Sequence, residues 1–173
     1  LNLALVVVEG TAGFLTDSVA LLADAGHNLS DVLGLLIAWG GSELAKMPAS
    51  KRFTYGLRGS TILAALFNGL LLLVAVGAIA LKARQRLAAP PHVPGGTVMI
   101  VAAIGIMVNL GTALLFVRGR KGDVNIRGAF LHMAADAAVS AGVVVAGALM
   151  LFTGNAWIDP LISLAIILVI LWS

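Results

Sequence analysis

Residues 60–81 read STILAALFNGLLLLVAVGAIAL, an apolar stretch without a single charged side chain. A helix of this composition can cross the hydrocarbon core of a bilayer, which needs about 20 apolar residues. The bias extends over all 173 residues, of which 60% are hydrophobic and 11% are charged, whereas soluble domains carry about 25% charged residues. The composition therefore excludes a soluble globular domain and predicts an integral membrane protein.

Polar connectors rich in proline, glycine and basic residues divide the chain into similar stretches. We expect membrane-spanning helices over residues 1–16, 18–44, 60–81, 97–117, 129–152 and 161–173. The first stretch is short and lacks an initiator Met, so we expect the chain to begin inside its first helix. The sequence thus predicts one all-α domain over the whole chain, a polytopic membrane protein with a bundle of six transmembrane helices.

Lys and Arg residues are unevenly distributed between the connectors. Eight belong to the connectors after the second and fourth spans, namely Lys46, Lys51, Arg52, Arg58, Arg118, Arg120, Lys121 and Arg127. Three belong to the connector after the third span, namely Lys82, Arg84 and Arg86. Because basic residues are retained on the cytoplasmic side of membranes, we expect the first two connectors and both termini to face the cytoplasm. The net charge of +3 reflects this topology, and no nucleic-acid partner is expected.

Ionisable residues are rare inside the expected spans, where each costs about 2.5–3.5 kcal/mol on insertion scales and is a candidate functional residue. They are Glu9, Asp24, His27, Asp31, His132 and Asp136. Two of the three His residues are followed by Asp four positions later, in the motifs HNLSD (27–31) and HMAAD (132–136). A step of four residues returns to the same face of a helix. Each motif therefore presents one imidazole nitrogen and one carboxylate oxygen to the same point.

Two such helices packed side by side predict a tetrahedral site of two His and two Asp ligands. Zinc accepts this set at about 2.0–2.2 Å per ligand, and the chain has no Cys that could supply a thiolate. Other interpretations remain open: either pair could be an interhelical hydrogen-bonded contact of a structural membrane module, or both could form a metal-free proton relay. An intramembrane metalloenzyme is a further alternative, although catalytic zinc keeps one position open for water.

Several motifs together carry a resemblance to a known family. They are SVALLADAGHNLSD (18–31), Glu9-Gly10, Tyr55-Gly56, LAALFN (63–68) and HMAAD (132–136). In this order they resemble the cation diffusion facilitator family of metal transporters, and the resemblance covers essentially the whole chain. It implies a transmembrane domain that acts as a homodimer in a lipid bilayer, here expected to be the bacterial inner membrane, and exchanges cytoplasmic divalent metal for protons.

The resemblance also assigns the metal ligands. His27, Asp31, His132 and Asp136 match the family's central transport site, and a set of two His and two Asp implies transported Zn²⁺, with Cd²⁺ or Co²⁺ also accepted and no resident cofactor. Family members usually add a cytoplasmic C-terminal domain, whereas this chain stops at residue 173. Either the chain is truncated, which the missing start of the first helix favours, or dimerisation relies on the membrane helices.

Polar residues near the motifs are expected in supporting roles. Asp24 lies seven residues before Asp31, about 10 Å along the helix axis, and we expect it to support the ligands or line the access path, with helix capping as the alternative. Asn28 and Ser140 could orient ligands or form interhelical hydrogen bonds. An interhelical hydrogen bond is also expected for Glu9. The remaining expectations are interhelical contacts for Asn68 and Asn109, a helix start for Asp159 and a solvated position for His92.

Overall fold

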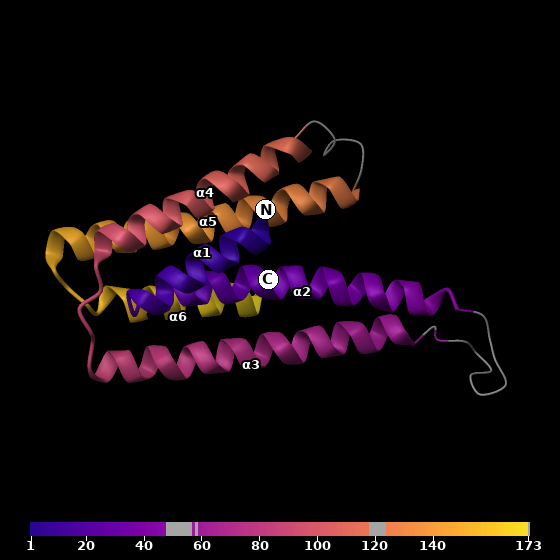
Figure 1. Cartoon of the computed structure of the whole chain (residues 1–173), viewed down its shortest axis with the longest axis horizontal. Helices are drawn as coiled ribbons and strands as arrows, with labels where there is room; N and C mark the ends of the chain where they lie inside the picture. The colour runs from indigo at the N-terminus through magenta and orange to yellow at the C-terminus, as the bar shows by residue number, and fades with distance from the viewer. Residues whose placement is uncertain (48–56, 58, 118–123, 173) are drawn as a thin grey trace.

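The computed structural model describes residues 1–47, 57, 59–117 and 124–172, with the side chains of 124, 125 and 172 left aside. These residues form six α-helices (Figure 1). The helices are α1 (Asn2–Leu15), α2 (Val19–Ala45), α3 (Ser60–Ala88), α4 (Gly95–Phe116), α5 (Val124–Thr153) and α6 (Ile158–Trp172). The expected all-α membrane architecture is confirmed, whereas the basic residues from Lys51 to Arg58 and from Arg118 to Lys121, with Tyr55-Gly56, lie outside the described residues.

Two helices extend beyond the expected spans. The third span was expected to end at residue 81, but α3 continues to Ala88, and α5 begins at Val124 instead of residue 129. Residues 82–86 are Lys, Ala, Arg, Gln and Arg, all good helix formers, and the first proline after them is Pro90. Charged residues therefore end the bilayer-crossing part of α3 without ending the helix, because their long side chains can reach the polar interface.

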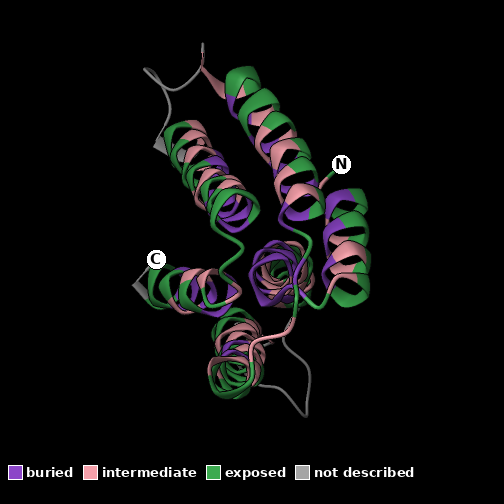
Figure 2. Cartoon of the chain, turned by 90° about the vertical axis from the view of Figure 1, so that its left-hand side faces the viewer, coloured by how far each residue is buried: buried purple, intermediate pink, exposed green. Residues whose placement is uncertain are grey.

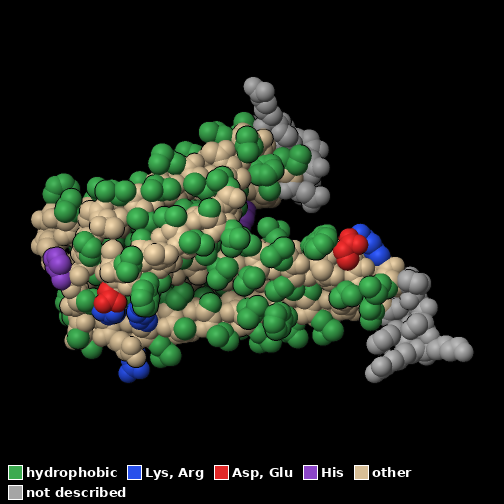
Figure 3. Space-filling model, in the orientation of Figure 1, with side chains coloured by type: hydrophobic (Ala, Val, Ile, Leu, Met, Phe, Trp, Pro, Cys, Tyr) green, Lys and Arg blue, Asp and Glu red, His purple; other side chains and the backbone are tan. Residues whose placement is uncertain are grey.

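Helix lengths and surface composition agree with a multi-pass membrane protein. Four helices are long and apolar enough to cross a bilayer, namely Val19–Ala45, Ser60–Ala88, Gly95–Phe116 and Ile126–Thr153, and α1 and α6 are apolar but shorter. On the face shown in Figure 3, Lys, Arg, Asp and Glu side chains lie near the two ends of the helices. Hydrophobic side chains cover the surface between them, as lipid requires.

The second helix is the centre of the bundle. It packs against α1, α3, α5 and α6, while α4 pairs mainly with α5, and the end-on view shows one helix with many buried residues surrounded by the others (Figure 2). In the α4–α5 pair the backbones touch, because a Cβ added to Gly95 would lie 2.5 Å from the Gly147 carbonyl oxygen. Small residues permit such close packing in lipid.

One end of the central helix is held by a carboxylate from the last helix. Asp159, in the first turn of α6, accepts hydrogen bonds from the Ser18 hydroxyl (2.5 Å), the Val19 N–H (2.7 Å) and the Ala20 N–H (3.3 Å). Ser18 in turn accepts the Leu21 N–H at 3.2 Å and is the N-cap of α2. Asp159 therefore marks the start of α6, as expected, and also satisfies first-turn donors of another helix.

Candidate metal site between the second and fifth helices

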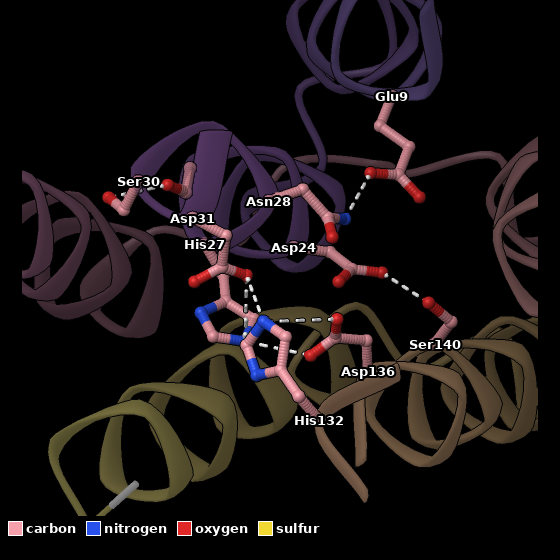
Figure 4. A network of polar contacts seen from close by, with 10 residues as sticks. Glu9, Asp24, His27, Asn28, Ser30, Asp31, His132, Asp136 and Ser140 are labelled. Carbon is pink, nitrogen blue, oxygen red and sulfur yellow. Dashed lines mark hydrogen bonds and ion pairs between the residues drawn. The ribbon is translucent and has the colours of Figure 1, made fainter. Parts of the chain in front are cut away.

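The two His-Asp motifs meet in the middle of the bundle. His27 and Asp31 come from α2, and His132 and Asp136 come from α5 (Figure 4). The His27 Nε2 atom lies 3.3 Å from Asp136 Oδ1 and 3.8 Å from Asp31 Oδ2. The His132 Nε2 atom lies 3.3 Å from Asp31 Oδ2 and 3.7 Å from Asp136 Oδ2. Each imidazole thus faces one carboxylate from its own helix and one from the other.

These separations are close to those of ligands around a common small ion. Four atoms placed about 2.0–2.2 Å from a central zinc ion at tetrahedral angles lie about 3.3–3.6 Å apart. Ligand atoms of His27, Asp31 and Asp136 all lie within 4.8 Å of one another. His132 is outside this tightest group, although its Nε2 contacts both carboxylates. The chemistry and closeness of these residues therefore suit a divalent cation.

Two of the carboxylate oxygens face an imidazole without forming a hydrogen bond of good geometry: Asp31 Oδ2 lies 3.3 Å and Asp136 Oδ2 lies 3.7 Å from His132 Nε2. Oδ2 of Asp31 and Oδ2 of Asp136 are buried and have no hydrogen-bond partner among the described residues. Buried anionic oxygens without a donor or a cation are costly. A cation held between the helices would compensate both charges, because two Asp carboxylates balance one divalent ion.

The site is closed on one side and accessible on the other. Asp136 is 1% exposed and His27 is 9% exposed, whereas the His132 side chain is 45% exposed. A cavity of about 280 Å³ adjoins the site, lined by His27, Ser30, Asp31, Gly34, Leu35, Asn68, Leu72, His132 and Ile170. On α2 the lining residues run from His27 toward the C-terminal end. At that end α4 and α5 separate from α2 and α3 (Figure 1).

The supporting residues lie on the other side of the ligands. Asp24 is fully buried and accepts a hydrogen bond from the Ser140 hydroxyl at 2.9 Å. The Asn28 amide donates to Glu9 Oε2 at 3.1 Å, so the expected interhelical hydrogen bond of Glu9 is present. Asp24 does not cap α2, because the N-cap is Ser18. Asn28 and Ser140 thus bond the two acidic residues Glu9 and Asp24, and no hydrogen bond from either to a ligand is observed among the described residues.

Some of the other polar residues lie where the sequence predicted, and others do not. His92 is exposed, as expected. Asn68 packs against Gly34 of α2, where an added Cβ would lie 2.9 Å from its Nδ2 atom. Sequence reasoning missed that Asn68 and Ser30 also line the cavity, although a polar residue inside an apolar span was the available signal. Asn109 is buried, and neither of its amide atoms has a hydrogen-bond partner among the described residues, contrary to the expected polar contact.

Comparison with known proteins shows the family of this chain. The family model described as the cation efflux transmembrane domain matches residues 1–173. The chain is 38% identical over 169 residues to the cadmium, cobalt and zinc/H(+)-K(+) antiporter of Bacillus subtilis (strain 168), covering 96% of this chain and 54% of that protein.

Two further relatives are similar at comparable levels. Over 160 residues, 36% are identical to the metal cation efflux system protein CzcD of Cupriavidus metallidurans, covering 92% of this chain and 51% of the relative. Over 168 residues, 36% are identical to the zinc transporter ZitB of Escherichia coli (strain K12), covering 96% and 54%. The chain thus spans about half the length of the curated relatives it matches.

Proposed function

Because the chain belongs to the cation efflux family, we propose that the protein exports a divalent metal ion, Zn²⁺ by preference, from the cytoplasm in exchange for protons. The transported ion binds between α2 and α5, to His27, Asp31, His132 and Asp136. The observation that carries this proposal is the set of four Nε2–carboxylate separations between 3.3 and 3.8 Å. The two contacts between helices, both 3.3 Å, lie within the spacing of ligands around a tetrahedral zinc ion, and the two within one helix, 3.7 and 3.8 Å, are slightly longer.

Zinc is the preferred substrate because the donor set suits it. Imidazole is a borderline ligand that suits zinc, and zinc also accepts carboxylate oxygens, whereas Mg²⁺ and Ca²⁺ prefer six or more oxygen ligands. Cd²⁺ and Co²⁺ are accepted as further substrates, in line with the printed name of the Bacillus subtilis relative. The metal is cargo, so the transporter needs no resident cofactor.

Protons drive release because they compete for the same atoms. Zinc binds neutral imidazole and ionised carboxylate, so protonation of the ligands expels the metal. In the arrangement seen, the cavity beside His132 supplies the path by which metal reaches the site. The basic connectors after α2 and α4 assign this open end to the cytoplasm. The ion is then released on the opposite side when the α4–α5 pair rocks against α2 and α3.

Two other functions fit the site less well. A metalloenzyme would need a water-bearing position on zinc and a general base beside it, whereas four protein groups converge here. In a metal-free proton relay or a purely structural contact, the buried Oδ2 atoms of Asp31 and Asp136 would have only imidazole contacts of 3.3–3.8 Å, none of which forms a hydrogen bond of good geometry among the described residues. The relatives also carry the names of antiporters, efflux proteins and transporters.

The membrane setting and assembly follow from the same family membership. We assign the protein to the bacterial inner membrane as a homodimer, with both termini cytoplasmic. Cross-linking in native membranes measures the dimer, and protease protection of tags at each terminus measures the orientation. Monomers throughout, or termini on opposite sides, would contradict these two assignments without affecting the metal site.

Transport in proteoliposomes tests the central proposal. With an imposed proton gradient, Asp31→Ala is expected to abolish zinc uptake, because it removes one of four ligands. His92→Ala is the matched control, since His92 is an exposed histidine in the connector between α3 and α4. Full uptake by Asp31→Ala would overturn the four-ligand site. Calorimetry in buffers of different ionisation enthalpy measures the protons released on zinc binding, and no release would overturn proton exchange.

A further inference from the structure

A second group of buried polar side chains lies next to the metal site. Glu9 from α1, Asp24 and Asn28 from α2 and Ser140 from α5 are all 0% exposed. Figure 4 shows their polar ends turned toward one another, on the side of the metal ligands that faces α1. The group offers oxygen acceptors and no imidazole, so its chemistry differs from that of the four metal ligands.

The hydrogen bonds of this group leave acceptors in excess. Asn28 Nδ2 donates to Glu9 Oε2 at 3.1 Å, and the Ser140 hydroxyl donates to Asp24 Oδ2 at 2.9 Å. Glu9 Oε1, Asp24 Oδ1 and Asn28 Oδ1 are buried and have no hydrogen-bond partner among the described residues. Native proteins satisfy nearly all buried polar atoms. Three buried oxygens without a partner in one polar group therefore indicate that the network has more acceptors than donors.

Among the described residues, no Lys or Arg side chain forms an ion pair with either of the two carboxylates. Asp24 interacts electrostatically with Glu9, His27 and Asp136. The ionisable residue of α6 is Asp159, which faces the start of α2. The ionisable residues of α3 are Lys82, Arg84 and Arg86, near its C-terminal end. The helix α4, which packs on α1, has no ionisable residue. Two ionised carboxylates in this apolar interior would repel each other, so a cation or a proton must accompany them.

The packing around Glu9 favours a proton over a metal ion. A Cβ added to Gly105 of α4 would lie 2.7 Å from Glu9 Oε1 and 3.1 Å from Ser140 Oγ. The α4 backbone thus closes directly against these oxygens and leaves little room for a coordinated ion with water. A proton requires no added volume. It would also convert an acceptor into a donor, as the excess of acceptors requires.

We propose that Glu9 and Asp24 form a proton-carrying pair, separate from the metal ligands, that holds a proton in the arrangement seen here. Protonated Asp24 Oδ1 becomes a donor for Asn28 Oδ1, one helical turn along the same face of α2. Asp24 lies on the N-terminal side of His27, away from the cavity that runs toward Leu35. This proposal rests on the proposed function for its role, since protons entering from the closed side would meet the pair before the metal ligands.

Infrared difference spectroscopy tests the proton itself, independently of transport. The measurement uses the protein in lipid, with metal removed by a chelator, and follows the carboxylic acid C=O band that shifts in D₂O. We expect a buried-acid band that is lost in Glu9→Gln or Asp24→Asn and retained in Glu43→Gln, an exposed control at the far end of α2. An unchanged band in both pair variants would overturn the proposal.

Two additions keep the test decisive. If Glu9→Gln or Asp24→Asn fails to fold, Ser140→Ala removes the hydrogen bond to Asp24 Oδ2 and is expected to shift the band without abolishing it; no shift would count against the pair. A titration with K⁺, Na⁺ or Mg²⁺ at constant pH measures competition from metal ions. If one of them displaces the band or stabilises wild type but not Asp24→Asn, the group is a metal-ion site and the proton pair is wrong.

Transport of zinc connects the pair to function. Asp24→Asn is expected to keep zinc binding in calorimetry but lose the dependence of zinc flux on the proton gradient. Asp31→Ala, in contrast, loses zinc binding itself, so failure of the proposed function and failure of the pair are separable. An Asp24→Asn protein with wild-type gradient dependence would remove the pair from the exchange pathway.

Discussion

The two ends of the bundle are built differently. At the end where α2 begins, Asp159 of α6 holds three donors from residues 18–20, and Arg86 of α3 pairs with Asp17 at 2.6 Å. At the end where α2 finishes, a cavity reaches from His132 past Gly34, and the α4–α5 pair stands apart from α2 and α3 (Figure 1). Polar contacts between helices close the end where α2 begins, and the cavity leaves the other end open. The placement of such contacts can therefore decide from which side the metal site is reached.

Removal of a ligand at the closed side of the metal site is expected to have the largest effect. Asp136→Ala deletes a carboxylate that contacts both His side chains. We expect zinc affinity to fall by more than about 100-fold. Removing a residue that only hydrogen-bonds a metal ligand already lowers metal affinity by about 10–100-fold. Calorimetry of purified protein measures the change. Ser30→Ala, which alters the cavity wall only, is the control, and an equal loss in that variant would contradict the ligand assignment.

Thiol labelling compares access to the two ends directly. The chain contains no Cys, so each introduced thiol reports one position. Ser30→Cys lines the cavity and is expected to react quickly with a water-soluble reagent, whereas Ser163→Cys on α6, at a fully buried position, is expected to react slowly. Zinc should protect Ser30→Cys when it closes the cavity. Equal labelling rates at both positions would refute the open and closed assignment.

Breaking the closed end should destabilise the protein by an intermediate amount. Asp159→Ala leaves donors of residues 18–20 without their acceptor, and hydrogen bonds to charged groups contribute about 1.5–3 kcal/mol each. We expect a lower melting temperature in detergent and faster labelling of a thiol near Ser18. Ser18→Ala loses an N-cap, which costs about 0.5–2 kcal/mol, and should have the smaller effect. The reverse order would show that Asp159 does not hold this end.

The ion pair of Arg86 should matter least. Its partner Asp17 is 53% exposed, and exposed ion pairs contribute about 0.2–1 kcal/mol. Arg86→Ala is therefore expected to lower the melting temperature only slightly, and less so at high salt. Lys46→Ala is the matched control at the open end, where Lys46 pairs with Glu43 at 2.6 Å on the surface. If Arg86→Ala lowered the melting temperature as much as Asp159→Ala, Arg86 would be the main contact that holds the closed end.

Some parts of this structure were predictable from the sequence, because a lipid environment requires long apolar helices and makes ionisable residues rare within them. The long charge-free stretches predicted the helices, and the rarity of ionisable residues isolated His27, Asp31, His132 and Asp136. Helix ends were less predictable, since α3 continues through Lys82 to Ala88 after it leaves the apolar stretch. The partner of Asp159 was also out of reach, because Ser18 lies 141 residues away in the chain.

The sequence by itself therefore determined that this is a helical membrane protein and singled out the side chains proposed to bind metal. The physical reason is that a bilayer cannot solvate charge, so every ionisable residue within a span is conspicuous. Only the tertiary structure decided that His132 is accessible while Asp136 is enclosed, that Asp159 closes one end, and that Glu9 lies beside Asn28 and Asp24. Those outcomes depend on how distant helices cross, which side-chain spacing along one helix does not encode.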